Sequence, residues 1–123
     1  MSRRQWRVRL GAVAELDFAN ILKWTTETFG PRQARIYRDT LVQAIGELAN
    51  GPDVPGSRAR DEIMPGLRSL HVARRGRRGR HFLLYRAAQG QVIEIGRILR
   101  DQIDLPRHLL PSPEEGDDDS STQ

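Results

Sequence analysis

The chain has 123 residues, of which 37% are hydrophobic and 29% charged, as in a globular protein with one domain. It contains no cysteine, which excludes disulfides, thiolate metal sites and a cysteine nucleophile. No apolar run approaches the ~20 residues that cross a bilayer, and the N-terminal MSRRQWRVRLG lacks the apolar core of a signal peptide. We therefore expect a cytoplasmic protein without a membrane partner.

The charge is unevenly distributed along the chain. The formal net charge is +4, but residues 1–110 hold 20 basic and 11 acidic residues, a net charge of +9. Such a surface attracts an anionic partner, either nucleic acid or an acidic protein segment. Nineteen of the 20 basic residues are arginine, a bias that GC-rich codon usage also produces, so the arginine excess alone does not decide between these partners.

The first predicted element is a strand. Trp6, Val8 and Leu10 alternate with arginines, the period of two that is typical of a half-buried strand. Apolar residues then recur at helical spacing over residues 12–28 and again over residues 31–50, which predicts two amphipathic helices. Gly30 and Pro31 separate them, and proline is favoured in a first helical turn. The two helices are therefore predicted to form an antiparallel hairpin.

Three further strands are predicted after the loop NGPDVPGS. They are GLRSLHV, HFLLYRA and QVIEIGRIL, all rich in branched and aromatic residues. AAQG joins the last two as a hairpin turn, while RRGRRGR lies between the first two and is predicted to form a solvated hairpin tip. Its two glycines are expected to supply the backbone freedom of the turn, with the arginines pointing into water.

The C-terminal part is predicted to contain a short helix and then a tail. RDQIDLPRHLL is consistent with a final turn of helix, whereas PSPEEGDDDSSTQ has no apolar residue and five carboxylates, and we expect it to be disordered. The whole order predicts an α+β fold. An N-terminal strand precedes an α-helical hairpin, a three-stranded antiparallel sheet packs against that hairpin, and a short C-terminal helix follows.

The ordered set of motifs resembles the ParE branch of the ParE/RelE superfamily, the toxins of type II toxin–antitoxin modules. The likeness covers roughly residues 6–109, and its features are Leu16-Asp17, Gly30, the Pro52 loop, PGLR, HFLLYR and IGRILRDQID. It implies a toxin domain over residues 1–110, followed by the acidic tail over 111–123. Two features depart from the family pattern. Arg100 stands where the family commonly has a histidine, and RRGRRG lengthens the hairpin loop.

The resemblance implies a binding protein without cofactor or metal. The three histidines have no ligand spacing and no phosphate-binding G-x-x-x-x-G-K-[ST] motif is present. The family activity is inhibition of DNA gyrase, and a cognate ParD-like antitoxin neutralises the toxin in a hetero-oligomer, with no sequence-specific binding of nucleic acid. Target contacts are expected from Arg75, Arg77, Arg78, Arg80, Arg97 and Arg100. Antitoxin contacts are expected from Trp6, Leu16, Trp24, Tyr37, Leu41 and Arg86.

Two alternatives stay open from the sequence. A RelE-like relative would cleave mRNA on the ribosome, which needs proton carriers and cations. Here these would be His81 and Glu94 for proton transfer, with Arg68 and Arg97 for the phosphate. The sheet lysines and C-terminal tyrosine of the RelE pattern are missing, since the one lysine, Lys23, falls in a predicted helix and no tyrosine follows Tyr85. The other alternative is a non-toxic module that retains the fold.

Overall fold

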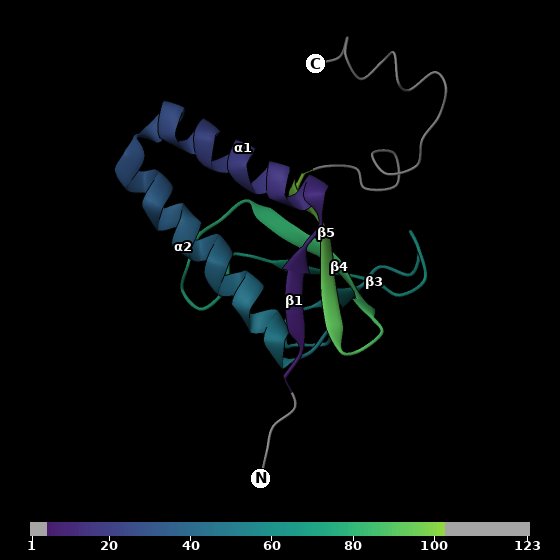
Figure 1. The fold of residues 1–123 in the computed structure, drawn as a ribbon. Helices are drawn as coiled ribbons and strands as arrows, with labels where there is room; N and C mark the ends of the chain where they lie inside the picture. The colour runs from purple at the N-terminus through teal and green to yellow at the C-terminus, as the bar shows by residue number, and fades with distance from the viewer. Residues whose placement is uncertain (1–4, 103–123) are drawn as a thin grey trace, which may run out of the picture.

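The computed structural model describes residues 5–102 (Figure 1). Two long helices pack side by side and cover one face of a sheet. The elements in chain order are β1 (Arg7–Leu10), α1 (Ala12–Phe29), α2 (Pro31–Glu47), the 3-10 helix η1 (Leu48–Asn50), β2 (Arg58–Ala59), β3 (Leu67–His71), β4 (His81–Ala88) and β5 (Val92–Arg100). The predicted α+β class and helical hairpin are confirmed. The predicted C-terminal helix and acidic tail lie outside the described residues.

The sheet is larger and more mixed than predicted. It has five strands in the order β1-β5-β4-β3-β2. The three predicted strands are antiparallel neighbours, as expected, but β1 adds to β5 in parallel, with Arg7 opposite Val92 and Leu10 opposite Ile95. The prediction of a three-stranded antiparallel sheet was therefore wrong, because β1 joins its partner across more than 80 residues of chain and β2 has only two residues.

The corner between the helices follows the predicted chemistry. Gly30 ends α1 with a φ of 97°, a conformation that strongly favours glycine. Its N–H donates to the carbonyl oxygen of Thr26 at 2.9 Å. Pro31 then occupies the first position of α2, where a backbone N–H would have no partner within the helix. This tight corner brings the C-terminal half of α1 beside the N-terminal half of α2.

Two apolar clusters hold the layers together. The larger lies between the helices and the sheet, and its wholly buried members are Ala14, Leu41, Leu48, Leu83, Ile93 and Ile95. The smaller lies on the other face of the sheet and contains Leu67, Phe82, Leu84 and Leu99. Strand β4 contributes to both clusters, so it is buried on both faces. The rigid end of β4, at His81, can therefore hold a functional group in a fixed position.

Candidate functional site

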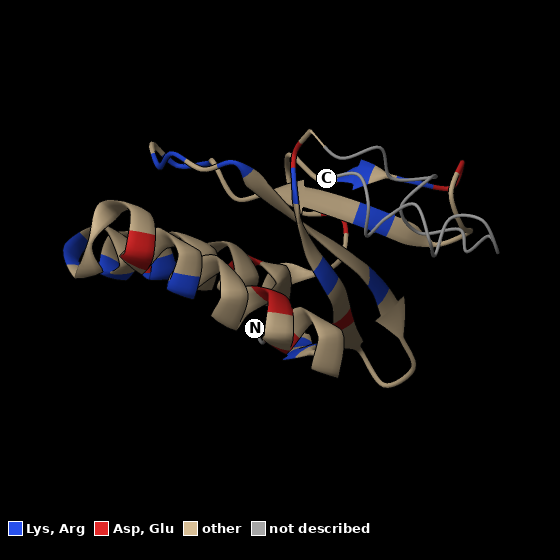
Figure 2. Cartoon of the chain, turned by 90° about the horizontal axis from the view of Figure 1, so that it is seen from above, with Lys and Arg blue, Asp and Glu red and all other residues tan. Residues whose placement is uncertain are grey.

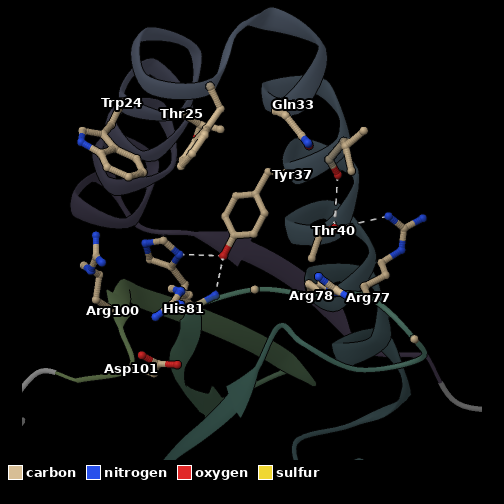
Figure 3. Close-up of a pocket in the computed structure, with 15 residues that line it drawn as sticks. Trp24, Thr25, Gln33, Tyr37, Thr40, Arg77, Arg78, His81, Arg100 and Asp101 are labelled. Carbon is tan, nitrogen blue, oxygen red and sulfur yellow. Dashed lines mark hydrogen bonds between the residues drawn. The ribbon is translucent and has the colours of Figure 1, made fainter.

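A groove of about 900 Å³ runs between the tip of the helical hairpin and the loop that joins β3 to β4 (Figure 3). One wall is apolar and comes from Trp24, Phe29 and Ile36, whose exposed fractions are 49%, 62% and 46%. The opposite wall is basic and comes from Arg77, Arg78, Arg80 and Arg100. The groove thus unites residues from all three sets predicted from the sequence: Trp24 and Tyr37 from the antitoxin set, the four arginines from the target set, and His81 from the catalytic set.

Tyr37 and His81 form a hydrogen-bonded pair at the base of the groove. The Tyr37 hydroxyl lies 2.7 Å from Nδ1 of His81 and also accepts the backbone N–H of Arg80 at 3.0 Å (Figure 3). The backbone of Arg80 and the ring of His81 thus hold the Tyr37 hydroxyl from two sides. Burial, and next the charge of Arg100, lower the pKa of His81 to about 4. Burial is also the main cause that raises the pKa of Tyr37.

The neutral, hydrogen-bonded state of His81 decides what the pair can do. At neutral pH the ring carries no charge, and Nδ1 is occupied by Tyr37. The ring therefore meets a partner in the groove through its other nitrogen, Nε2. His81 is buried, with 9% of its surface exposed, at the start of the strand that also carries the buried Leu83 and Tyr85. Its hydrogen bond to Tyr37 links residues 44 positions apart and had no signal in the sequence.

The arginine-rich loop is anchored to α2. Glu47 accepts Arg74 at 2.8 Å and Arg75 at 2.9 Å, and Arg77 donates to Gln43 at 2.6 Å and to Thr40 at 3.3 Å. The expectation that the loop arginines all point into water was therefore wrong. Burial acts to raise the pKa of Glu47, but the hydrogen bonds from Arg75 and Arg74 outweigh it and hold the pKa below its usual value. Figure 2 shows the basic residues that gather along this loop.

Three arginines of the predicted target set are not neutralised by an ion pair within the described residues. Arg78, Arg80 and Arg100 form no ion pair with any residue between 5 and 102. Arg100 lies 5.8 Å from the ring centre of Trp24, within the range of a cation–π contact. The position that departs from the family pattern is therefore part of the groove, where it links the apolar wall to the basic wall.

The two loop glycines have different roles, and only one matches the prediction. Gly76 has a φ of 79° with open space around it, so it supplies backbone freedom to the turn. Gly79 does not have a positive φ. A Cβ atom there would lie 2.6 Å from Cγ2 of Val72 and 3.0 Å from the Tyr37 hydroxyl. Gly79 is thus needed because the loop passes directly over Tyr37.

Substitution of Gly79 by alanine is expected to destabilise the chain by about 1–3 kcal/mol, the usual effect of forcing a methyl group into a packed site. Val72 is stiff at its branched Cβ, so the loop must lift away from Tyr37. Urea unfolding measures the effect. Alanine at Gly46, which is helical and has open space around it, is the matched control and should not destabilise. A Gly79→Ala variant as stable as the parent would contradict the close approach.

The remaining candidates for RNA cleavage do not converge on the groove. Arg97 is held by Asp17 of α1, with nitrogen–oxygen distances of 2.9 and 3.2 Å. Arg68 donates to the Pro52 carbonyl and the Ser57 hydroxyl. Glu94 accepts Arg9 at 2.6 Å and lies 3.9 Å from Arg86. Each of these side chains contacts a segment that is distant from it in the sequence, which is the pattern of a structural role.

The predicted antitoxin contacts also fall in different environments. Leu16, 60% exposed, and Trp24 lie on the accessible side of α1, whereas Trp6 packs against the core beside Gly51. The Arg86 side chain is exposed at the sheet. Leu41 is wholly buried, which corrects the expectation that it contacts a partner. Sequence reasoning missed Phe29 and Ile36, which extend the exposed apolar side of the hairpin.

Neither a metal-ligand cluster nor a membrane-spanning helix occurs among residues 5–102. In that range no three histidine, aspartate or glutamate side chains are grouped so that they could hold a metal ion. Neither helix in the same range is long and apolar enough to cross a bilayer. The groove combines exposed apolar surface, positive charge and the partly buried Tyr37–His81 hydrogen-bonded pair.

Comparisons with known proteins agree with this fold. The chain is 33% identical over 103 residues to Toxin ParE1 from two strains of Mycobacterium tuberculosis, CDC 1551 / Oshkosh and ATCC 25618 / H37Rv, which covers 84% of this chain and 97% of each relative. A structure of the chromosomal ParDE system from P. aeruginosa superposes with a TM-score of 0.64 at 22% identity, covering 77% of this chain and 95% of that one. The toxin–antitoxin complex RelBE2 from M. tuberculosis gives a TM-score of 0.54 at 20% identity, covering 78% and 98%.

The match to a family model is the most specific of these comparisons. The model describes the ParE toxin of the type II toxin–antitoxin system parDE, and it matches residues 8–105. This span takes in both helices, all of β2 to β5 and every residue that lines the groove. The chain belongs to the ParE toxin family of type II toxin–antitoxin systems.

Proposed function

We propose that this toxin acts by binding, that DNA gyrase is its target in the cytoplasm, and that a ParD-like antitoxin neutralises it. The observation that carries the proposal is the dispersal of the candidates for acid–base catalysis. His81 is neutral and hydrogen-bonded to Tyr37. Arg97 lines a smaller pocket with His81 but is paired there with Asp17, and Arg68 and Glu94 are occupied at other places in the fold. General acid–base cleavage needs a proton donor, an acceptor and cations around one reacting phosphate. The described residues do not provide that arrangement.

The target surface that fits this proposal is the basic wall of the groove. Arg75 and Arg97 are paired with Glu47 and Asp17, so they contribute less to an outside partner than their sequence positions suggested. Arg78, Arg80 and Arg100 have no such partner within residues 5–102. Their shared orientation toward one groove would concentrate positive potential there and attract an acidic surface of the target.

The antitoxin surface that fits is the exposed apolar side of the helical hairpin. Leu16, Trp24, Phe29 and Ile36 are each at least 46% exposed, and contiguous exposed apolar surface is typical of an interaction site. An amphipathic segment of an antitoxin could cover these residues and place acidic side chains beside the groove arginines. The two similar solved structures are a ParDE system and a RelBE2 toxin–antitoxin complex, which is consistent with a partner of this kind.

Purified toxin is expected to inhibit gyrase supercoiling and to leave mRNA on programmed ribosomes intact. Replacing Arg78, Arg80 and Arg100 together by serine should weaken the inhibition roughly tenfold, since three exposed charge contacts of about 0.5 kcal/mol each sum to about 1.5 kcal/mol. The matched control replaces Arg32, Arg35 and Arg38, three exposed arginines of α2 that do not line the groove. This control should change the inhibition little.

Two outcomes would contradict the proposal. One is ribosome-dependent cleavage of mRNA at defined codons that is lost in His81→Ala, which would establish the ribonuclease alternative. The other is normal supercoiling at every toxin concentration together with intact mRNA, which would fit a module that retains the fold without toxicity. Circular dichroism of each variant confirms that the fold persists before either assay is interpreted.

A further inference from the structure

We propose that the groove is a docking site for the chain's own acidic segment, residues 114–119, which competes there with other anionic partners. The proposal concerns the free toxin and does not depend on gyrase being the target. It rests on three properties of the molecule: the charge of the groove, the place where the described chain ends, and the order of residues that follow.

The groove carries a strong excess of positive charge. Its lining includes four arginines and a single carboxylate, Asp101. That carboxylate accepts Nε2 of His71 at 3.0 Å, and Arg77 is held by neutral groups, so its charge is not cancelled. His81, which is neutral, adds its imidazole ring to the lining. A carboxylate suits this site because it carries negative charge and accepts hydrogen bonds from arginine.

The chain leaves the sheet at the edge of this groove. Arg100, the last residue of β5, lines the groove, and the N–H of Asp101 donates to the Arg80 carbonyl at 2.9 Å. Eleven residues lie between Gln102 and Glu114, and an extended chain over these twelve steps reaches about 40 Å. The acidic segment can thus enter the groove without strain. A short tether also holds it at a local concentration of about 1 mM or more, which favours it over a partner in dilute solution.

The residues beyond Gln102 match the two walls of the groove in their order and chemistry. Ile103, Leu105, Leu109 and Leu110 come first and offer apolar surface to Trp24, Phe29 and Ile36. Five carboxylates follow within residues 114–119, enough to face Arg78, Arg80 and Arg100. The acidic segment would then shield the arginines that an outside partner needs, and a tighter partner would displace it. Because the contact is electrostatic and exposed, salt should weaken it.

The absence of cysteine from the chain allows a direct test on the full-length toxin alone. A single cysteine in place of Ser120 carries a nitroxide, and the broadening of backbone amide signals reports which residues the acidic segment visits. Amides at Thr25, Gly79 and His81 should lose at least half of their intensity. Gly90 is the internal control because the length of β4 separates it from the groove, and its signal should be unchanged.

Two variants decide whether charge pairing causes the effect. In the first, Glu114, Glu115, Asp117, Asp118 and Asp119 become the corresponding amides, a change outside the folded core. In the second, Arg78, Arg80 and Arg100 become serine, and the matched control again replaces Arg32, Arg35 and Arg38. The broadening should fall at least threefold in both groove-directed variants and in 1 M salt, but not in the control.

Equal broadening at the groove and at Gly90 would overturn the proposal, as would broadening that persists after the five carboxylates are neutralised. Neither result involves gyrase or an antitoxin, so a failure here is separate from a failure of the proposed function. If docking occurs, removing the five carboxylates should also increase the affinity of any anionic partner for the groove at low salt, and that gain should vanish when the three arginines are replaced.

Discussion

Replacing Asp17 with alanine is expected to lower the free energy of unfolding by about 3 kcal/mol. The Asp17 carboxylate accepts three hydrogen bonds, two from Arg97 and one from the backbone N–H of Ile98 at 2.9 Å. Its side chain is 15% exposed and that of Arg97 29% exposed, so both groups are largely removed from water. Alanine leaves the Arg97 charge and the Ile98 N–H without partners, and the loss of one member of a buried pair costs several kcal/mol.

Urea unfolding of the variant and its parent measures this effect. Arg9→Ala is the matched control, because it breaks the ion pair with Glu94 at the exposed end of the sheet, where the Arg9 side chain is 69% exposed. Such exposed pairs contribute about 1 kcal/mol or less. Asp17 and Arg97 join α1 to β5, next to the shift in register between β4 and β5. If Asp17→Ala lowers the free energy of unfolding no more than Arg9→Ala does, the Asp17–Arg97 pair does not anchor α1 to the sheet.

The second large effect is expected from acid. Burial and the charge of Arg100 lower the pKa of His81 to about 4 in the folded chain, whereas an exposed histidine has a pKa of about 6.5. Between these values the unfolded chain binds more protons than the folded chain, so acid favours unfolding. The contribution of the neutral His81 is complete above pH 6.5 and is lost as the pH falls toward 4. The expected loss is on the order of 2 kcal/mol.

The variant His81→Asn isolates this contribution. Asparagine keeps an acceptor for the Tyr37 hydroxyl but does not titrate, so the stability should vary less between pH 6.5 and 5 than in the parent. His71→Asn is the comparison variant, since His71 is the other histidine of the described chain and lies at the surface beside Asp101. The pKa of Glu47 lies below its usual value. The stabilisation that the Glu47 ion pairs contribute is therefore lost only at a lower pH, where this carboxylate becomes protonated. Equal slopes in the His81 variant and the parent would contradict the assignment.

The local sequence determined the elements that depend on neighbouring residues. The helical spacing of apolar residues, the Gly30-Pro31 corner and the short AAQG link predicted both helices and the β4–β5 hairpin, and the structure contains them. These features follow from backbone preferences and from short contacts along the chain, which a single sequence displays directly. The ordered motifs also led to the ParE family, which the comparisons confirmed.

Only the tertiary structure decided where β1 joins the sheet and which arginines face the groove. β1 pairs with β5 across more than 80 residues, and no local pattern specifies a partner at that separation. The sequence shows many arginines but not their neighbours. Glu47 pairs with Arg74 and Arg75, and Asp17 pairs with Arg97. Arg78 and Arg80 of the β3–β4 loop meet Arg100, at the end of β5, in one groove. An arginine's role depends on the charges within a few ångströms of it, and distant parts of the chain supply those charges.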